Sequence, residues 1–82
     1  MMTYMRFLKI ENGFLTYEYG NNRNDMIGTV TIEIANNENV TFFYYPDSKT
    51  QQFCPSTAHT IGRMYKFIKE NNFPKEYIYA AG

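Results

Sequence analysis

Cys54 and His59 are the two residues whose types and spacing could support nucleophilic catalysis. Cys54 directly precedes a predicted helix, where the helix dipole favours a thiolate, and His59 would lie about one turn into that helix. A phosphate-binding cysteine loop requires an arginine six residues after the cysteine, but Thr60 occupies that position and Arg63 follows three residues later. We therefore predict no catalytic site, and we interpret Cys54 as a small buried thiol and His59 as a surface or capping residue.

The segment from Gly20 to Asp25 is the one candidate for metal binding, because its Asn and Asp oxygens are of the kind that bind calcium. An EF-hand loop has alternating acidic residues, a central glycine and a distal glutamate, and this segment lacks that order. We interpret it as a polar loop between strands. No motif for a cofactor rises above chance, so we predict neither a metal nor a cofactor.

Aromatic residues offer a different chemistry, because rings on a sheet surface can stack on unpaired bases or fill a protein interface. They make up 18% of the 82 residues, all of them Tyr or Phe. The strongest structural signal, Ile27 to Pro46, carries many of them and predicts a β-hairpin. Val30, Ile32 and Ile34 alternate with polar residues at the period of a half-buried strand, and the asparagines that follow suit a tight turn.

The register of this hairpin decides which aromatic side chains share a face. If Asn37-Glu38 is a two-residue turn, Ile32 faces Phe43, and the second aromatic set lies on the opposite face with Thr31. An odd loop length exchanges the two sets. In either register one face forms the core and the other keeps aromatic surface that a partner or the C-terminal tail would cover. The second set comprises Val40, Phe42 and Tyr44.

The N-terminal region predicts a first hairpin, with strands at Thr3 to Glu11 and Phe14 to Tyr19. Asn12-Gly13 between them is the preferred two-residue turn, because both positions need positive φ. This turn places Glu11 opposite Phe14, Lys9 opposite Thr16 and Phe7 opposite Glu18. Tyr17 and Tyr19 are in phase on the second strand, so we count them among the aromatic candidates for binding.

A helix follows the second hairpin, with Ser56 as its predicted N-cap and Asn71-Asn72 at its end. Apolar residues recur at helical spacing and predict one buried face. Gly62 in the middle of the helix costs roughly 1 kcal/mol relative to alanine, and we expect a close approach of helix to sheet to require it. The tail, Lys75 to Gly82, is predicted to add a short strand or to dock on the open face of the sheet.

Composition and charge limit the domain organisation and the cellular location that we expect. The chain is predicted to form a single domain over residues 1–82, with a net charge of zero. Residues 1–48 hold three basic and six acidic residues, net −3, and residues 49–82 hold five basic and two acidic, net +3. One cysteine and no long apolar run predict a reduced, cytoplasmic protein with no signal peptide and no membrane span.

We therefore expect an α+β fold, in which a four-stranded antiparallel sheet made of two β-hairpins is followed by one helix packed on one face and a short extended tail. The predicted function is that of a non-enzymatic interaction module that binds or inhibits a partner protein, or binds itself as a homodimer, through an aromatic sheet face. A sheet edge could also pair with a partner strand. Size and composition resemble those of phage and mobile-element accessory proteins, including inhibitors of host defence. The alternative is a single-stranded nucleic-acid binder that uses Tyr and Phe stacking. The candidate interaction residues are Phe42, Tyr44, Tyr17, Tyr19, Arg63 and Lys66.

Overall fold

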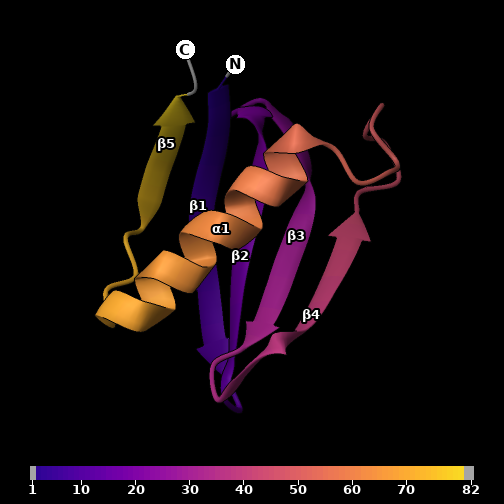
Figure 1. Ribbon diagram of the computed structural model, residues 1–82. Helices are drawn as coiled ribbons and strands as arrows, with labels where there is room; N and C mark the ends of the chain where they lie inside the picture. The colour runs from indigo at the N-terminus through magenta and orange to yellow at the C-terminus, as the bar shows by residue number, and fades with distance from the viewer. Residues whose placement is uncertain (1, 81–82) are drawn as a thin grey trace.

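A computed structural model describes residues 2–80 as an antiparallel sheet with one helix lying across one of its faces (Figure 1). The strand order is β4-β3-β2-β1-β5, so β4 and β5 form the two edges. The predicted α+β fold is confirmed, with a minor difference: the C-terminal tail forms a fifth strand. The elements are β1 (Met2–Glu11), β2 (Phe14–Asn22), β3 (Asp25–Glu33), β4 (Asn36–Tyr44), α1 (Pro55–Glu70) and β5 (Glu76–Ala80).

The first hairpin has the predicted turn. Asn12 and Gly13 have φ angles of +52° and +82°, and Glu11 lies opposite Phe14. The predicted pairing of Phe7 with Glu18 is wrong, because the register shifts between Phe7 and Lys9 and places Phe7 opposite Tyr17. A β-bulge of this kind inserts one extra residue in one strand and cannot be recognised from the alternation alone.

The second and third strands extend further than the sequence indicated. The predicted loop from Gly20 to Asp25 is instead the end of a long hairpin, and the turn proper is Arg23-Asn24. The register shifts on both sides of Gly20, and a Cβ at this position would lie 2.3 Å from the carbonyl oxygen of Asp25. The glycine therefore lets the two backbones approach closely where the hairpin bends.

The central hairpin has the alternative register. The turn falls at Ile34-Ala35 rather than Asn37-Glu38, and Val30 lies opposite Phe42. The N–H of Ile34 donates a hydrogen bond of 2.9 Å to the carbonyl oxygen of Gly13. This contact joins the turn of the central hairpin to the turn of the first, so a tertiary hydrogen bond helps to hold a turn position that local sequence did not indicate.

The helix begins earlier than predicted. Its N-cap is Cys54 rather than Ser56, with Pro55 in the first turn, and Asn71 ends the helix with φ +50°. The expectation that Gly62 permits a close approach is wrong, because a Cβ there would meet nothing within 4 Å. Its conformational cost is therefore not explained by packing against the sheet.

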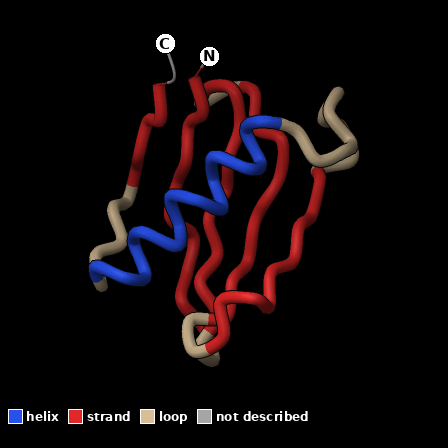
Figure 2. Tube along the Cα trace, viewed as in Figure 1, coloured by secondary structure: helices blue, strands red, loops and turns tan. Residues whose placement is uncertain are grey.

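The core lies between α1 and the sheet. Tube and ribbon views show that α1 crosses the strands obliquely and that β5 lies beside β1 at one edge (Figures 1 and 2). Strand β5 pairs with β1 in antiparallel register, with Tyr77 opposite Met5 and Tyr79 opposite Thr3. The tail therefore extends the sheet and does not cover its free face. The buried apolar cluster comprises Met5, Leu15, Tyr17, Tyr19, Ile27, Val30, Ile32, Met64 and Phe67.

Candidate interaction surface

The two β2 tyrosines predicted to bind a partner are core residues. Tyr17 and Tyr19 are both 0% exposed. The Tyr17 hydroxyl donates to the carbonyl oxygen of Pro74 at 2.6 Å, and the Tyr19 hydroxyl is hydrogen-bonded to Thr57 Oγ1 at 2.9 Å. Burial raises the pKa of each phenol to about 12. Their assignment to an interaction face is therefore corrected, because the face of β2 that carries them is the one that α1 covers.

Phe42 and Tyr44 lie on the same side of the sheet as these core tyrosines, at its β4 edge. Cross-strand neighbours share a face, and Phe42 is opposite Val30 while Tyr44 is opposite Gly28. Tyr44 is half-buried and packs against the core cluster, whereas 41% of Phe42 is exposed. Of these two candidates, Phe42 is thus the one with a large exposed surface.

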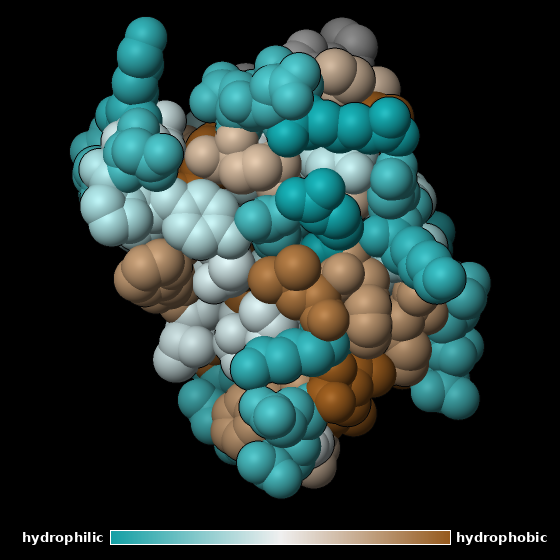
Figure 3. Space-filling view, turned by 180° about the vertical axis from the view of Figure 1, so that it is seen from behind, coloured by the Kyte–Doolittle hydropathy of each residue, from teal (hydrophilic) through white to brown (hydrophobic). Residues whose placement is uncertain are grey.

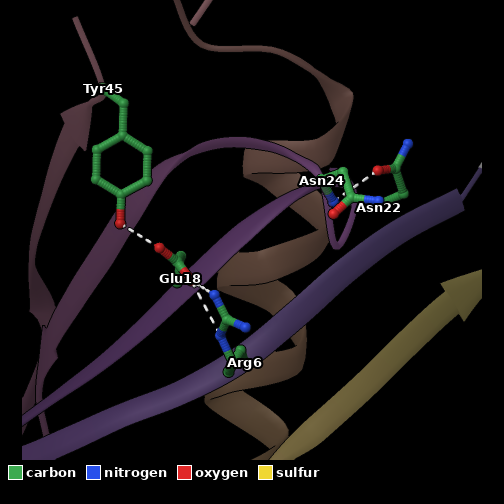
Figure 4. A network of polar contacts seen from close by, with 5 residues as sticks. All are labelled: Arg6, Glu18, Asn22, Asn24 and Tyr45. Atoms are coloured by element: carbon green, nitrogen blue, oxygen red, sulfur yellow. Dashed lines mark hydrogen bonds and ion pairs between the residues drawn. The ribbon is translucent and has the colours of Figure 1, made fainter. Parts of the chain in front are cut away.

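The face of the sheet away from α1 is polar at its centre. Glu18 accepts hydrogen bonds from the Arg6 guanidinium and from the Tyr45 hydroxyl, so one carboxylate joins β1, β2 and the residue that follows β4 (Figure 4). Burial, followed by the hydrogen bond and the charge of Glu18, raises the pKa of Tyr45 to about 12. Thr16 and Thr31 are hydrogen-bonded nearby at 2.9 Å. The aromatic surface expected on the second face is confined to its β4 side, where Phe43 packs against Tyr45.

Tyr4 also belongs to this face, but another side chain covers it. It is 2% exposed, and the Arg23 guanidinium lies over its ring at 5.6 Å. Arg23 also forms an ion pair with Glu76 of β5. The turn of the β2–β3 hairpin thus reaches over the sheet. The space-filling view from behind shows hydrophobic side chains interspersed with polar ones on this side (Figure 3).

Apart from the polar face, the protein has a second exposed feature, the outer edge of β4. The N–H of Tyr45 donates to the carbonyl oxygen of Ile27 at 2.9 Å. Because antiparallel pairing alternates along a strand, Thr41 and Phe43 direct their backbone groups toward β3. The backbone groups of the intervening residues point outward, where the sheet described for residues 2–80 has no further strand. Those residues are Val40, Phe42 and Tyr44.

Exposed phenylalanines flank this edge on both sides. Phe43 lies on the face away from α1 and is 54% exposed, and its ring packs edge-on against Tyr45 at 5.9 Å. On the helix side, Phe42 packs edge-on against Phe53 at 5.7 Å, and Phe53 is also 54% exposed. We call Phe42, Phe43, Phe53 and the outward backbone of β4 the β4 edge.

Sequence reasoning missed one member of the β4 edge and left another dependent on the register. Phe43 belongs to the exposed aromatic set only in the alternative register, and the structure has that register, with Phe43 opposite Thr29. Phe53 lies in the connection before the helix and belongs to no periodic pattern. The available signal was a single large apolar residue at the end of an otherwise polar segment, next to a helix start.

Arg63 and Lys66, the helical candidates, lie on α1 away from the β4 edge. The Arg63 guanidinium is 4.9 Å from the ring centre of Tyr79 and 5.5 Å from that of Tyr77, both on β5. Since β4 and β5 are opposite edges, the predicted residues do not form one site. They divide into a buried pair, the β4 edge and a cationic segment of the helix beside β5.

Cys54 and His59 have separate surroundings. The Cys54 sulfur is half-buried and lies 3.4 Å from Thr57 Oγ1. His59 Nδ1 lies 3.3 Å from Thr3 Oγ1, and its ring packs against Tyr79 at 4.3 Å. Within residues 2–80, no hydrogen bond joins the thiol to the imidazole, and no three His, Cys, Asp or Glu side chains form a group that could hold a metal ion.

Comparisons with known proteins give no assignment to a family. No protein-family model matches the chain, and no curated protein or solved structure matches it. In the described part of the chain, α1 is neither long nor apolar enough to cross a membrane.

Proposed function

We propose that this protein is a non-enzymatic protein-interaction module whose binding surface is the β4 edge. The observation that supports this proposal is an unpaired edge strand with exposed phenylalanines on both sides. Outward N–H and C=O groups allow a partner strand to extend the sheet, and apolar side chains on either face add buried area. The cytoplasmic location indicated by the single cysteine belongs to the same proposal.

The composition of the second half of β4 supports this role, because the charged residue Glu38 and the register shift of this strand both lie before Val40. Natural edge strands are protected by lysines, prolines or bulges that prevent further pairing. From Asn39 to Tyr45 the chain contains no charged residue and no proline. The opposite edge, β5, is shorter, begins with Glu76 and is preceded by Lys75. The two edges therefore differ in their capacity to accept a strand, and β4 is the better acceptor.

A second copy of the chain is the partner that we propose first. If two β4 strands pair antiparallel with Phe42 on the two-fold axis, Val40 of each copy faces Tyr44 of the other. The outward backbone groups of Phe42 then bond to those of its equivalent, those of Val40 and Tyr44 bond to each other across the axis, and the contact closes as a symmetric dimer. The strand is uncharged over this stretch, so no like charges meet across the axis. Binding of a different protein by the same edge would block that protein's own sheet edge.

The test is the mass in solution, measured by light scattering on a sizing column over a range of concentrations. We expect a dimer for the wild type and a monomer for Phe42→Lys, because a lysine on the edge repels its equivalent across the axis and is hydrated. Ile78→Lys is the matched control, since Ile78 is 56% exposed on the opposite edge strand. It should leave the dimer intact. Circular dichroism should show that both variants are folded.

A wild-type monomer at every concentration would contradict self-pairing. The wild type and the two variants, immobilised as baits, then test for a different partner in host lysate. A protein that is retained by the wild type and by Ile78→Lys, but not by Phe42→Lys, would assign the β4 edge to that protein. Equal retention by all three baits would contradict the proposed surface. Retention of a labelled single-stranded oligonucleotide that weakens as salt rises would instead favour nucleic-acid binding.

A further inference from the structure

A groove lies between the first half of α1 and strand β5, on the side of the molecule opposite the β4 edge. Its volume is about 320 Å³, and it is lined by Ala58, His59, Gly62, Arg63 and Tyr79. Figure 1 shows β5 at this edge of the sheet, beside β1, with α1 crossing the strands obliquely. None of these residues belongs to the β4 edge, so an inference about the groove is independent of the proposed function.

Arg63 is held in place by aromatic rings. Its guanidinium lies 4.9 Å from the centre of the Tyr79 ring and 5.5 Å from that of Tyr77. Within residues 2–80 it makes no ion pair, and the ion pairs there are Arg6–Glu18, Lys9–Glu11 and Arg23–Glu76. Stacking uses the face of a guanidinium and leaves its N–H edges for an acceptor. The cation is therefore positioned in advance for an anion.

His59 adds a second polar group beside Arg63, four residues earlier on the same side of the helix. Its Nδ1 lies 3.3 Å from the Thr3 hydroxyl, which itself donates to Ser56 Oγ at 3.1 Å. These contacts fix the orientation of the His59 ring in the wall of the groove. The ring is also packed against Tyr79.

Gly62 shapes the groove. A glycine inside a helix is unfavourable by roughly 1 kcal/mol relative to alanine, and packing does not require this one, because a Cβ would meet nothing within 4 Å. Its structural consequence is open space in the wall of the groove between His59 and Arg63. Gly62 therefore leaves room for a ligand beside Arg63.

We propose that this groove binds the phosphate group of a small phosphorylated molecule. A guanidinium fork matches the oxygens of a phosphate, and Lys66, one turn beyond Arg63, adds positive charge. The acidic residue of β5, Glu76, is paired with Arg23. The proposed ligand group is the phosphate alone. The ring of Tyr79 already contacts both Arg63 and His59, so the groove offers no stacking surface for a base.

Chemical-shift titration of the labelled full-length chain with inorganic phosphate, and separately with adenosine monophosphate, tests this proposal. We expect both to shift the same backbone resonances around residues 58–63 and at Tyr79. Arg63→Gln should weaken binding by about tenfold or more, the loss typical of one charge-assisted hydrogen bond. Lys69→Gln removes one positive charge outside the groove and should change the affinity less than about twofold.

Gly62→Leu distinguishes the effect of filling the groove from an effect on the stability of the helix. Leucine favours the helix over glycine, so this variant should unfold at a higher temperature while it binds phosphate at least about tenfold more weakly, because its side chain fills the groove. Unaltered binding by Gly62→Leu, or equal losses in Arg63→Gln and Lys69→Gln, would overturn the site. Shifts with an oligonucleotide but none with adenosine monophosphate would overturn the assignment to a small molecule.

Discussion

The hydroxyl of Tyr17 donates a hydrogen bond of 2.6 Å to the carbonyl oxygen of Pro74. This bond joins the middle of the sheet to the segment between α1 and β5, 57 residues later in the chain. Two further contacts support the same region: Phe67 of α1 packs against Tyr17 at 5.4 Å and against Tyr77 at 5.3 Å. The position of β5 at the sheet edge therefore depends on the core as well as on its pairing with β1.

Removal of this hydroxyl should weaken the attachment of β5. We expect Tyr17→Phe to lower the free energy of unfolding by about 1 kcal/mol, the net value of one hydrogen bond, and to speed amide exchange in β5. Tyr65→Phe is the matched control, because the Tyr65 hydroxyl donates to Asn37 at an exposed site. It should change stability by less than about 0.5 kcal/mol. Equal effects of the two variants in urea denaturation would contradict a special role for the Tyr17 bond.

Three tyrosines should make the fold sensitive to alkali. The pKa values of Tyr17, Tyr19 and Tyr45 are each raised to about 12, from an ordinary value of 10.0. Between these values the folded chain keeps protons that the unfolded chain has released, so stability is fully present below pH 10 and falls as pH rises toward 12. Urea midpoints measured across this range should decline, and the decline should be shallower in Tyr17→Phe. A flat profile would contradict the raised values.

The carboxylate of Glu18 should control the titration of Tyr45. Glu18→Gln removes the negative charge that, after burial, keeps the Tyr45 proton in place, so the pKa of Tyr45 should fall from about 12 toward its ordinary value. Glu76→Gln is the control, since it breaks a second ion pair on this face, with Arg23, and leaves the Tyr45 hydrogen bond intact. An NMR titration of the Tyr45 ring decides between the outcomes. The same pKa in both variants would exclude Glu18 as a cause.

Substitution by alanine should have opposite effects on the free energy of unfolding at Gly28 and at Gly62. A Cβ at Gly28 would lie 1.9 Å from the carbonyl oxygen of Phe43, so Gly28→Ala should push β4 away from β3 and lower the free energy of unfolding by about 3 kcal/mol. A Cβ at Gly62 meets nothing within 4 Å, so Gly62→Ala should raise the free energy of unfolding by up to about 1 kcal/mol. Thermal unfolding of the two variants measures both. A stabilised Gly28→Ala protein would show that β4 packs less closely than described.

The sequence determined the parts of this protein that depend on local chemistry. The Asn12-Gly13 turn requires positive φ at both positions, so the first hairpin followed from two residues. Apolar residues at helical spacing, with Asn71 at the end, located α1 to within two residues at each end. The succession of strands followed by a helix gave the α+β class. Arg63 and Lys66 could be named as cations of the helix, although not placed relative to β5.

The tertiary structure decided the register and the partners of each face. Local alternation did not fix the position of the central turn, which the hydrogen bond from Ile34 to Gly13 holds. That register moved Phe42 to the helix side and Phe43 to the free face. The burial of Tyr17 and Tyr19 depended on which face α1 covered, since alternation identifies two faces without saying which one the helix will contact. The β4 edge exists because the tail paired with β1 at the opposite edge, and only contacts between distant segments of the chain could determine that choice.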